Sequence, residues 1–278
     1  MVKEPLSPTV FETMRTYNGR VRAFDLHFNR LIESWKLINK QTPLASTIST
    51  IRNKTTKLIS KNKLSYGYFT PEKNLTNHPF NQEQAIRIYL SAELELSVEF
   101  SDLDQTYIHR SCSIITTHIP SSFPPAAKHI ARKPWDQVRH ELKCDEILLC
   151  DLAGAPLETN HSNFWILEMD CSPQECLAQL SVNTPYPLRH LRWYTHPADG
   201  QILSGITRQL IISIFKTLGA QVFEQKNVPL RTGQDQVYFL TSTLKSIAWV
   251  KSVDRVPQIP YPFIPLLFPL IDGYLSVY

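Results

Sequence analysis

Apolar and polar residues alternate near the start of the chain and then change to a helical spacing. Residues 9–15 alternate as a strand does, and residues 21–24 are placed to form the returning strand. Asn18-Gly19 stands between them, and this dipeptide favours a tight hairpin because both central residues of a type I′ turn need positive φ. Beyond residue 25, apolar side chains recur three and four positions apart, at Phe28, Leu31, Ile32, Trp35 and Ile38. The pattern predicts a β-hairpin followed by an amphipathic helix.

The remainder of the first half is expected to contain one more helix and three strands. Apolar residues within 45–62 favour a helix, and residues 65–70 and 85–91 have the character of strands. The polar run between these two strands predicts a loop. Residues 107–115 are expected to form the last strand of this half.

A proline-rich stretch predicts the boundary between two domains. Residues 118–125 contain three prolines and two serines, which stop both helix and sheet. We therefore expect an N-terminal domain of residues 1–119, a linker at residues 120–125 and a C-terminal domain of residues 126–278.

The second half continues the mixture of helices and strands. A helix at residues 135–143 is followed by strands at residues 146–152 and 163–169. A second helix opens after Gly205 and ends before Gly219, a residue suited to a helix C-terminus. Further strands are expected at residues 221–224, 236–241 and 247–253. The whole pattern predicts an α/β protein.

Composition narrows the class of protein. The chain has 278 residues, of which 42% are hydrophobic, so it can bury a substantial core. Its net charge is only +4 and its basic residues are scattered, so nucleic acid is not an expected partner. The nine histidines show no metal-ligand spacing, so no metal site is expected. With only 8 glycines in the chain, motifs that normally rely on glycine should depart from their usual form.

Cysteine usage and the two chain ends bear on the compartment. The five cysteines form no C-x-x-C pair, which favours reduced thiols over a disulfide framework. The N-terminal residues contain no apolar signal segment. Residues 259–278 are apolar, but four prolines and Asp272 interrupt them, so we expect packing on the protein or a partner subunit rather than a membrane-spanning helix. A cytoplasmic protein without a membrane partner is the expectation.

Lys128 and Glu158 are the first candidate pair for chemistry. A lysine amine can hold a pyridinium aldehyde covalently, and a carboxylate in a following strand–loop–strand unit can pair with the ring nitrogen and keep it protonated. Taken singly, each residue is more simply explained as a solvated surface group. The order and spacing of further segments decide between these interpretations.

A second set of residues suits a phosphate group. Gly205-Ile206-Thr207 opens a helix, where backbone N–H groups and the helix dipole favour an anion. Ser242-Thr243 follows a strand and adds hydroxyl donors, and Arg30 lies off the apolar stripe of the first helix and could supply the charge. Each residue also has a plainer role, in capping a helix, ending a strand or facing solvent.

Taken together, these segments resemble the class IV aminotransferase family over nearly the whole chain and in the family's order. The matching segments are residues 10–20, H-x-x-R-L at 27–31, K-x-x-x-R-x-x-W-D at 128–136, D-E-x-L-L at 145–149, and residues 157–163, 202–208 and 239–244. The resemblance implies a two-domain α/β (α+β) enzyme of fold type IV. Its smaller N-terminal domain would be α/β, and its larger C-terminal domain would bind the cofactor and contain a barrel-like sheet.

By that resemblance the cofactor is pyridoxal 5′-phosphate, and Lys128 is the Schiff-base lysine and general base. Lys133 is the rival lysine, but the spacing from Lys128 to Arg132 and Asp136 fits the family. Glu158 would be the partner of the ring nitrogen. The phosphate would be held by Arg30, Thr207, Ser242, Thr243 and the backbone N–H of Ile206. Arg87 on its strand is a candidate for binding the substrate carboxylate, although it could equally be an ordinary exposed arginine.

The resemblance also favours one reaction. Residues 241–246 look more like the N-S-L-R-G loop of 4-amino-4-deoxychorismate lyases than the G-T-A loop of branched-chain aminotransferases. The lysine segment is similar to that of lyase domains. The expected reaction therefore releases 4-aminobenzoate and pyruvate, on the route to folate. The alternative is an aminotransferase acting on D-amino or branched-chain amino acids, since Ser242-Thr243 also resembles the S-T of D-amino acid transaminases. A catalytically decayed member is the third possibility.

Several positions depart from the family's pattern. Leu157 stands where Thr is usual, Asn160-His161 replaces a Gly-Ser-like pair, Ser204 stands where Pro is common, and Ser246 replaces a glycine. These departures bear on the substrate more than on cofactor binding. Because the family's members are commonly dimers with the site near the subunit interface, a homodimer acting on a small-molecule substrate is expected.

Overall fold

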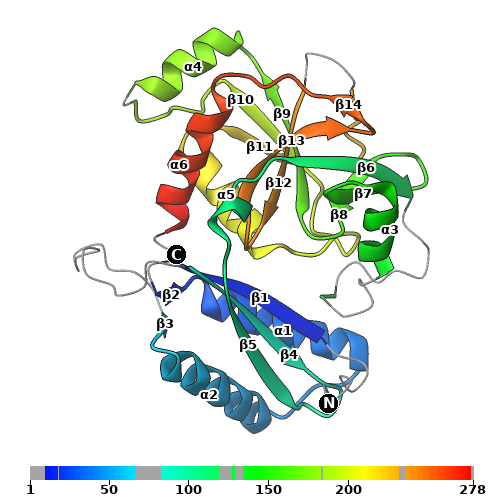
Figure 1. Cartoon of the computed structure of the whole chain (residues 1–278), viewed down its shortest axis with the longest axis vertical. Coiled ribbons are helices and arrows are strands. Elements are labelled where there is room, and N and C mark those ends of the chain that lie inside the picture. The colour runs from blue at the N-terminus through cyan, green and yellow to red at the C-terminus, as the bar shows by residue number, and fades with distance from the viewer. Residues whose placement is uncertain are drawn as a thin grey trace. The chain divides into compact units, whose positions relative to one another are not determined.

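A computed structural model describes residues 10–17, 19–66, 83–118, 127–128, 134–182, 184–231 and 236–276. The chain divides into two compact units (Figure 1). The described residues up to Tyr107, together with residues 127–128 and Ser276, belong to the first unit, and the second unit contains the described residues of 108–118 and 134–275.

The first unit is built on a sheet whose five strands, among the described residues, have the order β3-β2-β1-β4-β5. The strands are β1 (Val10–Tyr17), β2 (Arg20–Val21), β3 (Ser65–Tyr66), β4 (Gln84–Leu90) and β5 (Leu96–Asp102). The helices are α1 (Phe24–Asn39) and α2 (Ala45–Lys61), and a short 3₁₀ turn spans Gln105–Tyr107. The predicted hairpin and both predicted helices of this half are therefore confirmed.

The β1–β2 hairpin has the register that its turn sequence predicts. Thr16 pairs with Val21 and Tyr17 pairs with Arg20, so two residues connect the strands. Gly19 has φ 76°, as the second residue of such a turn requires. Asn18 lies outside the described residues. Because the turn is so short, it fixes which residues of β1 face inward.

The inward face of β1 carries a carboxylate into an otherwise apolar core. Val10 and Met14 are fully buried on this face, together with apolar side chains of β4 and α1. Glu12 lies between them at the same alternation and is also fully buried. A charged group in this position requires partners, and α1 provides them.

The second unit is a larger sheet that closes on itself. Its nine strands, counted over the described residues, are β6 (Cys112–His118), β7 (Glu146–Cys150), β8 (Pro156–Thr159), β9 (Asn163–Met169), β10 (Leu191–Thr195), β11 (Gln221–Glu224), β12 (Val237–Ser242), β13 (Ser246–Val253) and β14 (Val256–Pro257). Six of them follow the order β9-β12-β13-β6-β7-β8, and a further pairing of β8 with β9 completes a barrel-like ring. This is the fold expected for the larger half of a fold-type IV enzyme.

Four helices of the described residues accompany this ring (Figure 1). They are α3 (Pro134–Leu142), α4 (Pro173–Ser181), α5 (Ile206–Thr217) and α6 (Ile264–Leu275). The apolar stripe of α5 is buried as the sequence predicts, with Ile211 and Phe215 fully covered. Among the described residues, no helix combines the length and the apolar character needed to cross a membrane.

Two local expectations differ from the structure. The strand predicted at residues 107–115 begins at Cys112, and it pairs with β13 and β7 of the large sheet rather than with the first half. Alternation identifies a strand but not its neighbours in a sheet, because pairing depends on residues far along the chain. The predicted linker at residues 120–125 lies outside the described residues, so a domain boundary at that point stays a prediction.

The C-terminal stretch packs on the protein, but as a helix. α6 buries Ile264, Leu267, Ile271 and Leu275, which recur at helical spacing. Pro265 falls in the first turn, where a missing N–H costs nothing, and Pro269 lies inside the helix. Two of the four prolines in this stretch are therefore accommodated within a short helix, and Pro260 and Pro262 precede it.

Candidate active site

Glu158, the predicted partner of a ring nitrogen, is held at the point where β8 meets β9. Its side chain is only 2% exposed. One carboxylate oxygen, Oε2, accepts hydrogen bonds from the backbone N–H of Leu203 at 3.1 Å and from Nδ2 of Asn163 at 3.2 Å. Two donors on one oxygen fix the orientation of the carboxylate in the sheet.

Asn163 connects Glu158 to the segment before α5. Besides its bond to Glu158, Nδ2 donates to the carbonyl of Leu203 at 3.1 Å. A Cβ placed on Gly205 would stand 1.8 Å from Oδ1 of Asn163, so only glycine fits there. Asn163 also pairs with Glu158 across β8 and with Thr241 across β12. Three of the family-like segments, at residues 157–163, 202–208 and 239–244, therefore meet at this residue.

The N-terminus of α5 has the geometry of an anion site. Gly205 is the N-cap residue, and it has no side chain with which to satisfy the N–H groups of the first turn. Ile206 and Thr207 follow as the first helical residues and are 3% and 2% exposed. A helix start without a side-chain cap directs its N–H groups and its dipole toward a bound anion.

The predicted loop at Ser242-Thr243 is a tight turn between β12 and β13. Ser242 pairs with Ser246, so three residues connect the strands. Ser246, the first residue after this turn, has φ 60°, a left-handed conformation that favours glycine. Oγ of Ser242 accepts from the backbone N–H of Lys245 at 3.3 Å. A serine therefore occupies a backbone conformation in which glycine is the less strained residue.

A buried ion pair lies behind this turn. Nζ of Lys245 contacts Glu146, and both side chains are almost fully buried. Glu146 also accepts hydrogen bonds from the hydroxyls of Thr159 and Ser162, the latter at 3.0 Å. Burial alone would raise the pKa of Glu146, but the Lys245 ammonium beside it lowers that pKa below its usual value. The pair ties the Ser242–Ser246 turn to the loop that follows Glu158.

The substituted pair Asn160-His161 serves the same loop. Oδ1 of Asn160 accepts from the backbone N–H of Ile147 at 2.9 Å, which attaches the loop to β7. The ring of His161 contacts Asp136 of α3 at 2.8 Å. Both departures from the family's pattern therefore have local structural roles.

In the first unit, Arg30 is paired with the buried carboxylate of Glu12. Nε and Nη2 of Arg30 donate to the two oxygens of Glu12 at 2.6 and 2.7 Å, a bidentate arrangement. Nδ1 of His27 lies 2.9 Å from Oε2 of the same carboxylate. Burial lowers the pKa of His27 to about 4, so the ring is neutral at neutral pH and donates to Glu12. Arg30 is thus a positioned cation rather than a solvated helix residue.

Lys128 is attached to the same group of residues. Its backbone carbonyl accepts from the N–H of Phe11 at 3.0 Å, and its own N–H donates to Oγ of Ser34 at 3.3 Å. Nζ lies 5.4 Å from the centre of the Phe11 ring. Burial alone would raise the pKa of Glu12, but the Arg30 guanidinium and then the Lys128 ammonium lower it well below the usual range.

Arg87 lies on β4, where it pairs with Thr13 of β1 and Glu99 of β5. Its side chain is half-buried, and its neighbours Ile86 and Ile88 face the core instead. Arg87 is therefore on the face of the sheet opposite Glu12. No contact in the structure assigns it a ligand, and its role stays a prediction.

The structure brings the candidates together in two groups. Glu158, the start of α5 and the Ser242–Ser246 turn meet around Asn163 in the second unit, whereas Arg30 and Lys128 share Glu12 in the first. The pairing of Lys128 with Glu158 across one ring stays a prediction. Arg132 and the rival lysine Lys133 lie outside the described residues.

Sequence reasoning missed the residues that hold these groups. They are Glu12, His27, Glu146, Asn163 and Lys245. All five stand in or beside segments quoted for the family resemblance, and His27 is the first residue of H-x-x-R-L. Their positions in or beside these segments could have identified them, but the residues that each one contacts are known only from the structure.

The donor set suits a phosphorylated pyridine ring. The second unit supplies a buried, oriented carboxylate, a helix start without a side-chain cap and two hydroxyl residues. A Cβ at residue 205 would displace Asn163, which orients the carboxylate. Among the described residues there is no cluster of three or more side chains able to hold a metal ion. The fold and the site define a two-domain enzyme of the pyridoxal-phosphate class.

Comparison with known proteins agrees with this class. A family model described as amino-transferase class IV matches residues 9–253, and the chain belongs to that family. This confirms the resemblance in the sequence, and the family's members are pyridoxal 5′-phosphate enzymes acting on small molecules. The chain is accordingly an aminotransferase or a lyase of this class.

Individual proteins match at low identity. A probable branched-chain-amino-acid aminotransferase of Rickettsia bellii is 25% identical over 254 residues, covering 89% of this chain and 78% of the relative. A hypothetical aminotransferase of Mycobacterium tuberculosis, solved in a PLP-bound form, superposes with a TM-score of 0.70 at 17% identity, covering 99% of this chain and 95% of the other. A protein of Legionella pneumophila provisionally named 4-amino-4-deoxychorismate lyase gives a TM-score of 0.67 at 16% identity, covering 96% and 91%. At these identities the solved structures establish the fold alone.

Proposed function

We propose that this protein is a lyase that splits 4-amino-4-deoxychorismate into 4-aminobenzoate and pyruvate. The observation that carries the proposal is the Ser242–Ser246 turn. Its residues resemble the N-S-L-R-G loop of such lyases, and Ser246, at the position of that glycine, has a left-handed backbone conformation that glycine favours. The provisional name of the Legionella protein supports the same reaction.

Each candidate residue has a defined task in this proposal. Glu158, oriented by two N–H donors, would accept a hydrogen bond from the protonated nitrogen of the ring. The N–H groups of Ile206 and Thr207, with the hydroxyls of Ser242 and Thr243 and the guanidinium of Arg30, hold the phosphate. When bound, pyridoxal 5′-phosphate supplies an electron sink for the carbon atom next to the substrate amine.

Lys128 performs the proton transfers. Its amine would hold the cofactor before substrate binds, and the freed amine would take the proton from the α-carbon and help to protonate the departing fragment. Arg87 is proposed to bind the substrate carboxylate. Since the substrate amine is not passed to a second molecule, no keto-acid acceptor is needed.

A pyruvate-release assay tests the proposal. The purified protein, supplied with pyridoxal 5′-phosphate and aminodeoxychorismate but no keto acid, should release pyruvate and 4-aminobenzoate in equal amounts. Lys128→Ala should release neither. If pyruvate fails to form while the wild-type protein binds the cofactor, the lyase assignment is wrong.

The second candidate function is an aminotransferase acting on D-amino or branched-chain amino acids. It is favoured by the name of the Rickettsia relative and by the Ser242-Thr243 pair. Such an enzyme needs a keto-acid acceptor and converts its cofactor to the pyridoxamine form, which absorbs at a shorter wavelength. Adding an amino acid alone and recording the absorbance spectrum distinguishes the two reactions. A catalytically decayed member would bind the cofactor and turn over neither substrate.

We also propose, by family analogy, that the protein is a cytoplasmic homodimer. Sedimentation equilibrium of the purified chain tests the oligomeric state. A monomer at concentrations that support activity would contradict it.

A further inference from the structure

Two thiols face one another at the start of α4, at the other end of β9 from Asn163. The Sγ atoms of Cys171 and Cys176 are 2.8 Å apart. Ser172 caps α4 through a reciprocal capping box with Glu175, so Cys171 directly precedes the cap and Cys176 is the fourth helical residue. Side chains at these two positions normally pack together and fix the path of the chain into the helix. The capping box therefore holds the two sulfur atoms in place.

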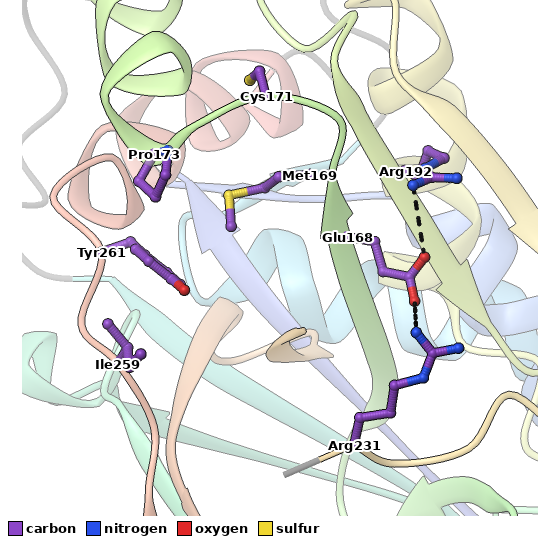
Figure 2. A pocket seen from close by; sticks show the side chains of 8 residues that line it. All are labelled: Glu168, Met169, Cys171, Pro173, Arg192, Arg231, Ile259 and Tyr261. Atoms are coloured by element: carbon purple, nitrogen blue, oxygen red, sulfur yellow. Dashed lines mark ion pairs between the residues drawn. The ribbon is translucent and has the colours of Figure 1, made fainter. Parts of the chain in front are cut away.

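The two thiols differ in access. Cys171 is half-buried and lines a cavity of about 560 Å³ together with Met169, Pro173 and Tyr261 (Figure 2). Cys176 is only 3% exposed. Burial, and the Cys171 thiol beside it, raise the pKa of Cys176 to about 12. Cys171 is therefore the more accessible of the two thiols, and an oxidant from solvent should react there first.

We propose that Cys171 and Cys176 form a redox modification site that a peroxide converts to an intramolecular disulfide. In the first step the sulfur of Cys171 attacks one peroxide oxygen, the O–O bond breaks and one water leaves, which yields a sulfenic acid. In the second step the sulfur of Cys176 attacks that sulfenic sulfur, the S–S bond forms, the S–O bond breaks and a second water leaves. In total two thiols are oxidised and one peroxide is reduced to two waters.

The other cysteines provide the contrast. Cys144 is also half-buried, but its Sγ contacts the backbone carbonyl of Arg139 at 3.8 Å rather than another thiol. Cys112 and Cys150 are buried, and burial raises the pKa of each to about 11. Cys144 is therefore the matched control, because it has similar access and no resolving thiol. The expectation of reduced thiols describes the protein before oxidation.

Peptide mapping after treatment with hydrogen peroxide tests the site. Free thiols are alkylated, and the protein is cut by a glutamate-specific protease, which cleaves after Glu175 and so separates the two cysteines. In the wild type the peptides carrying Cys171 and Cys176 should stay joined, with a loss of about 2 Da for the two hydrogen atoms removed, and dithiothreitol should release them. Cys144→Ser should give the same joined peptides.

Single substitutions define the order of events. Cys176→Ser should leave Cys171 as a sulfenic acid that dimedone traps, whereas Cys171→Ser should abolish both products. Thermal denaturation of each variant verifies that it is folded. If the peroxide leaves the pair unjoined in the folded wild type, or oxidises Cys144 before Cys171, the proposal is wrong. The assay needs neither cofactor nor substrate, so its outcome is independent of the proposed reaction.

Discussion

Asn163 and Gly205 pack so closely that the side-chain amide of one occupies the space of a β-carbon on the other. The position of such a Cβ is 1.8 Å from Oδ1 of Asn163. The same amide holds Glu158, so the start of α5 and the carboxylate share one support.

Gly205→Ala should therefore displace Asn163 and loosen Glu158. We expect the free energy of unfolding to fall by about 1–3 kcal/mol and cofactor affinity to weaken, because buried donors lose their partners. Denaturant titration and fluorescence titration with pyridoxal 5′-phosphate measure the two effects. Gly273→Ala is the control, because a Cβ at that helical position meets nothing within 4 Å. It should be neutral or stabilising, by up to about 1 kcal/mol.

Removing one partner of the Glu146–Lys245 pair should be strongly destabilising. Lys245→Met leaves a buried carboxylate without its cation, which typically costs about 3–5 kcal/mol of unfolding free energy. The same substitution in the exposed i,i+3 pair of Lys36 with Glu33 should cost less than about 0.5 kcal/mol. A loss at residue 245 no larger than at residue 36 would show that the buried pair does not support the turn.

Acid should weaken the first unit through His27. Its folded-state pKa of about 4 lies below the ordinary 6.5, so between these pH values the unfolded chain binds a proton at His27 and the folded chain does not. The stability that this contributes is complete above pH 6.5 and is lost as the pH falls toward 4, by about 3 kcal/mol. Glu12, whose pKa is also lowered, acts in the same direction at lower pH.

His27→Gln should flatten that pH dependence, since an amide can still donate to Glu12 but does not titrate. Urea unfolding at a series of pH values between 7 and 4 measures the slope. His140→Gln, at an exposed position of α3, should leave the slope unchanged. If the free energy of unfolding changes with pH equally in the wild type and in His27→Gln, His27 does not cause the pH dependence.

At residue 246, glycine should be more stable than alanine. Ser246 is fully buried with φ 60°, a conformation that costs a side chain about 1 kcal/mol relative to glycine. Both substitutions remove the hydroxyl, so the difference between Ser246→Gly and Ser246→Ala isolates the backbone strain. At Ser213, exposed within α5, the order should reverse by a similar amount. Thermal denaturation of the four variants provides the comparison.

Lys128→Ala should abolish the cofactor adduct that borohydride traps on the wild-type protein. Lys133→Ala should retain it, because the family-like spacing to Arg132 and Asp136 begins at Lys128. Mass spectrometry of the reduced protein and its peptides locates the adduct. Loss of the adduct in Lys133→Ala alone would transfer the assignment to Lys133.

Local sequence patterns predicted the helices and strands better than they predicted which strands pair in a sheet. The hairpin around Gly19 and the stripe of α1 follow from residues close in sequence, and both are confirmed. The pairing of β6 with β13 joins residues far apart, and no local pattern encodes it. The sequence also left α4 and β10 unpredicted, although Ser172 and Glu175 of the capping box were readable at the start of α4.

The candidate site shows the same division. Residues such as Glu158 and Thr207 could be predicted because a family resemblance fixes their order along the chain. Their supports could not, since Glu146 and Lys245 are 99 residues apart in the sequence and meet only in the folded sheet. Asn163 was part of a quoted segment, but its task depends on where its amide points.

A single residue pair, Glu158 with Asn163, joins β8 to β9. The residue pair that closes the barrel-like ring thus also contains the carboxylate that is proposed to bind the cofactor. A substitution that weakens this pair should have two effects. Amide hydrogen exchange along β8 should become faster, and the proposed cofactor should dissociate faster. The stability of the ring and the affinity for the proposed cofactor therefore depend on the same pair, Glu158 and Asn163.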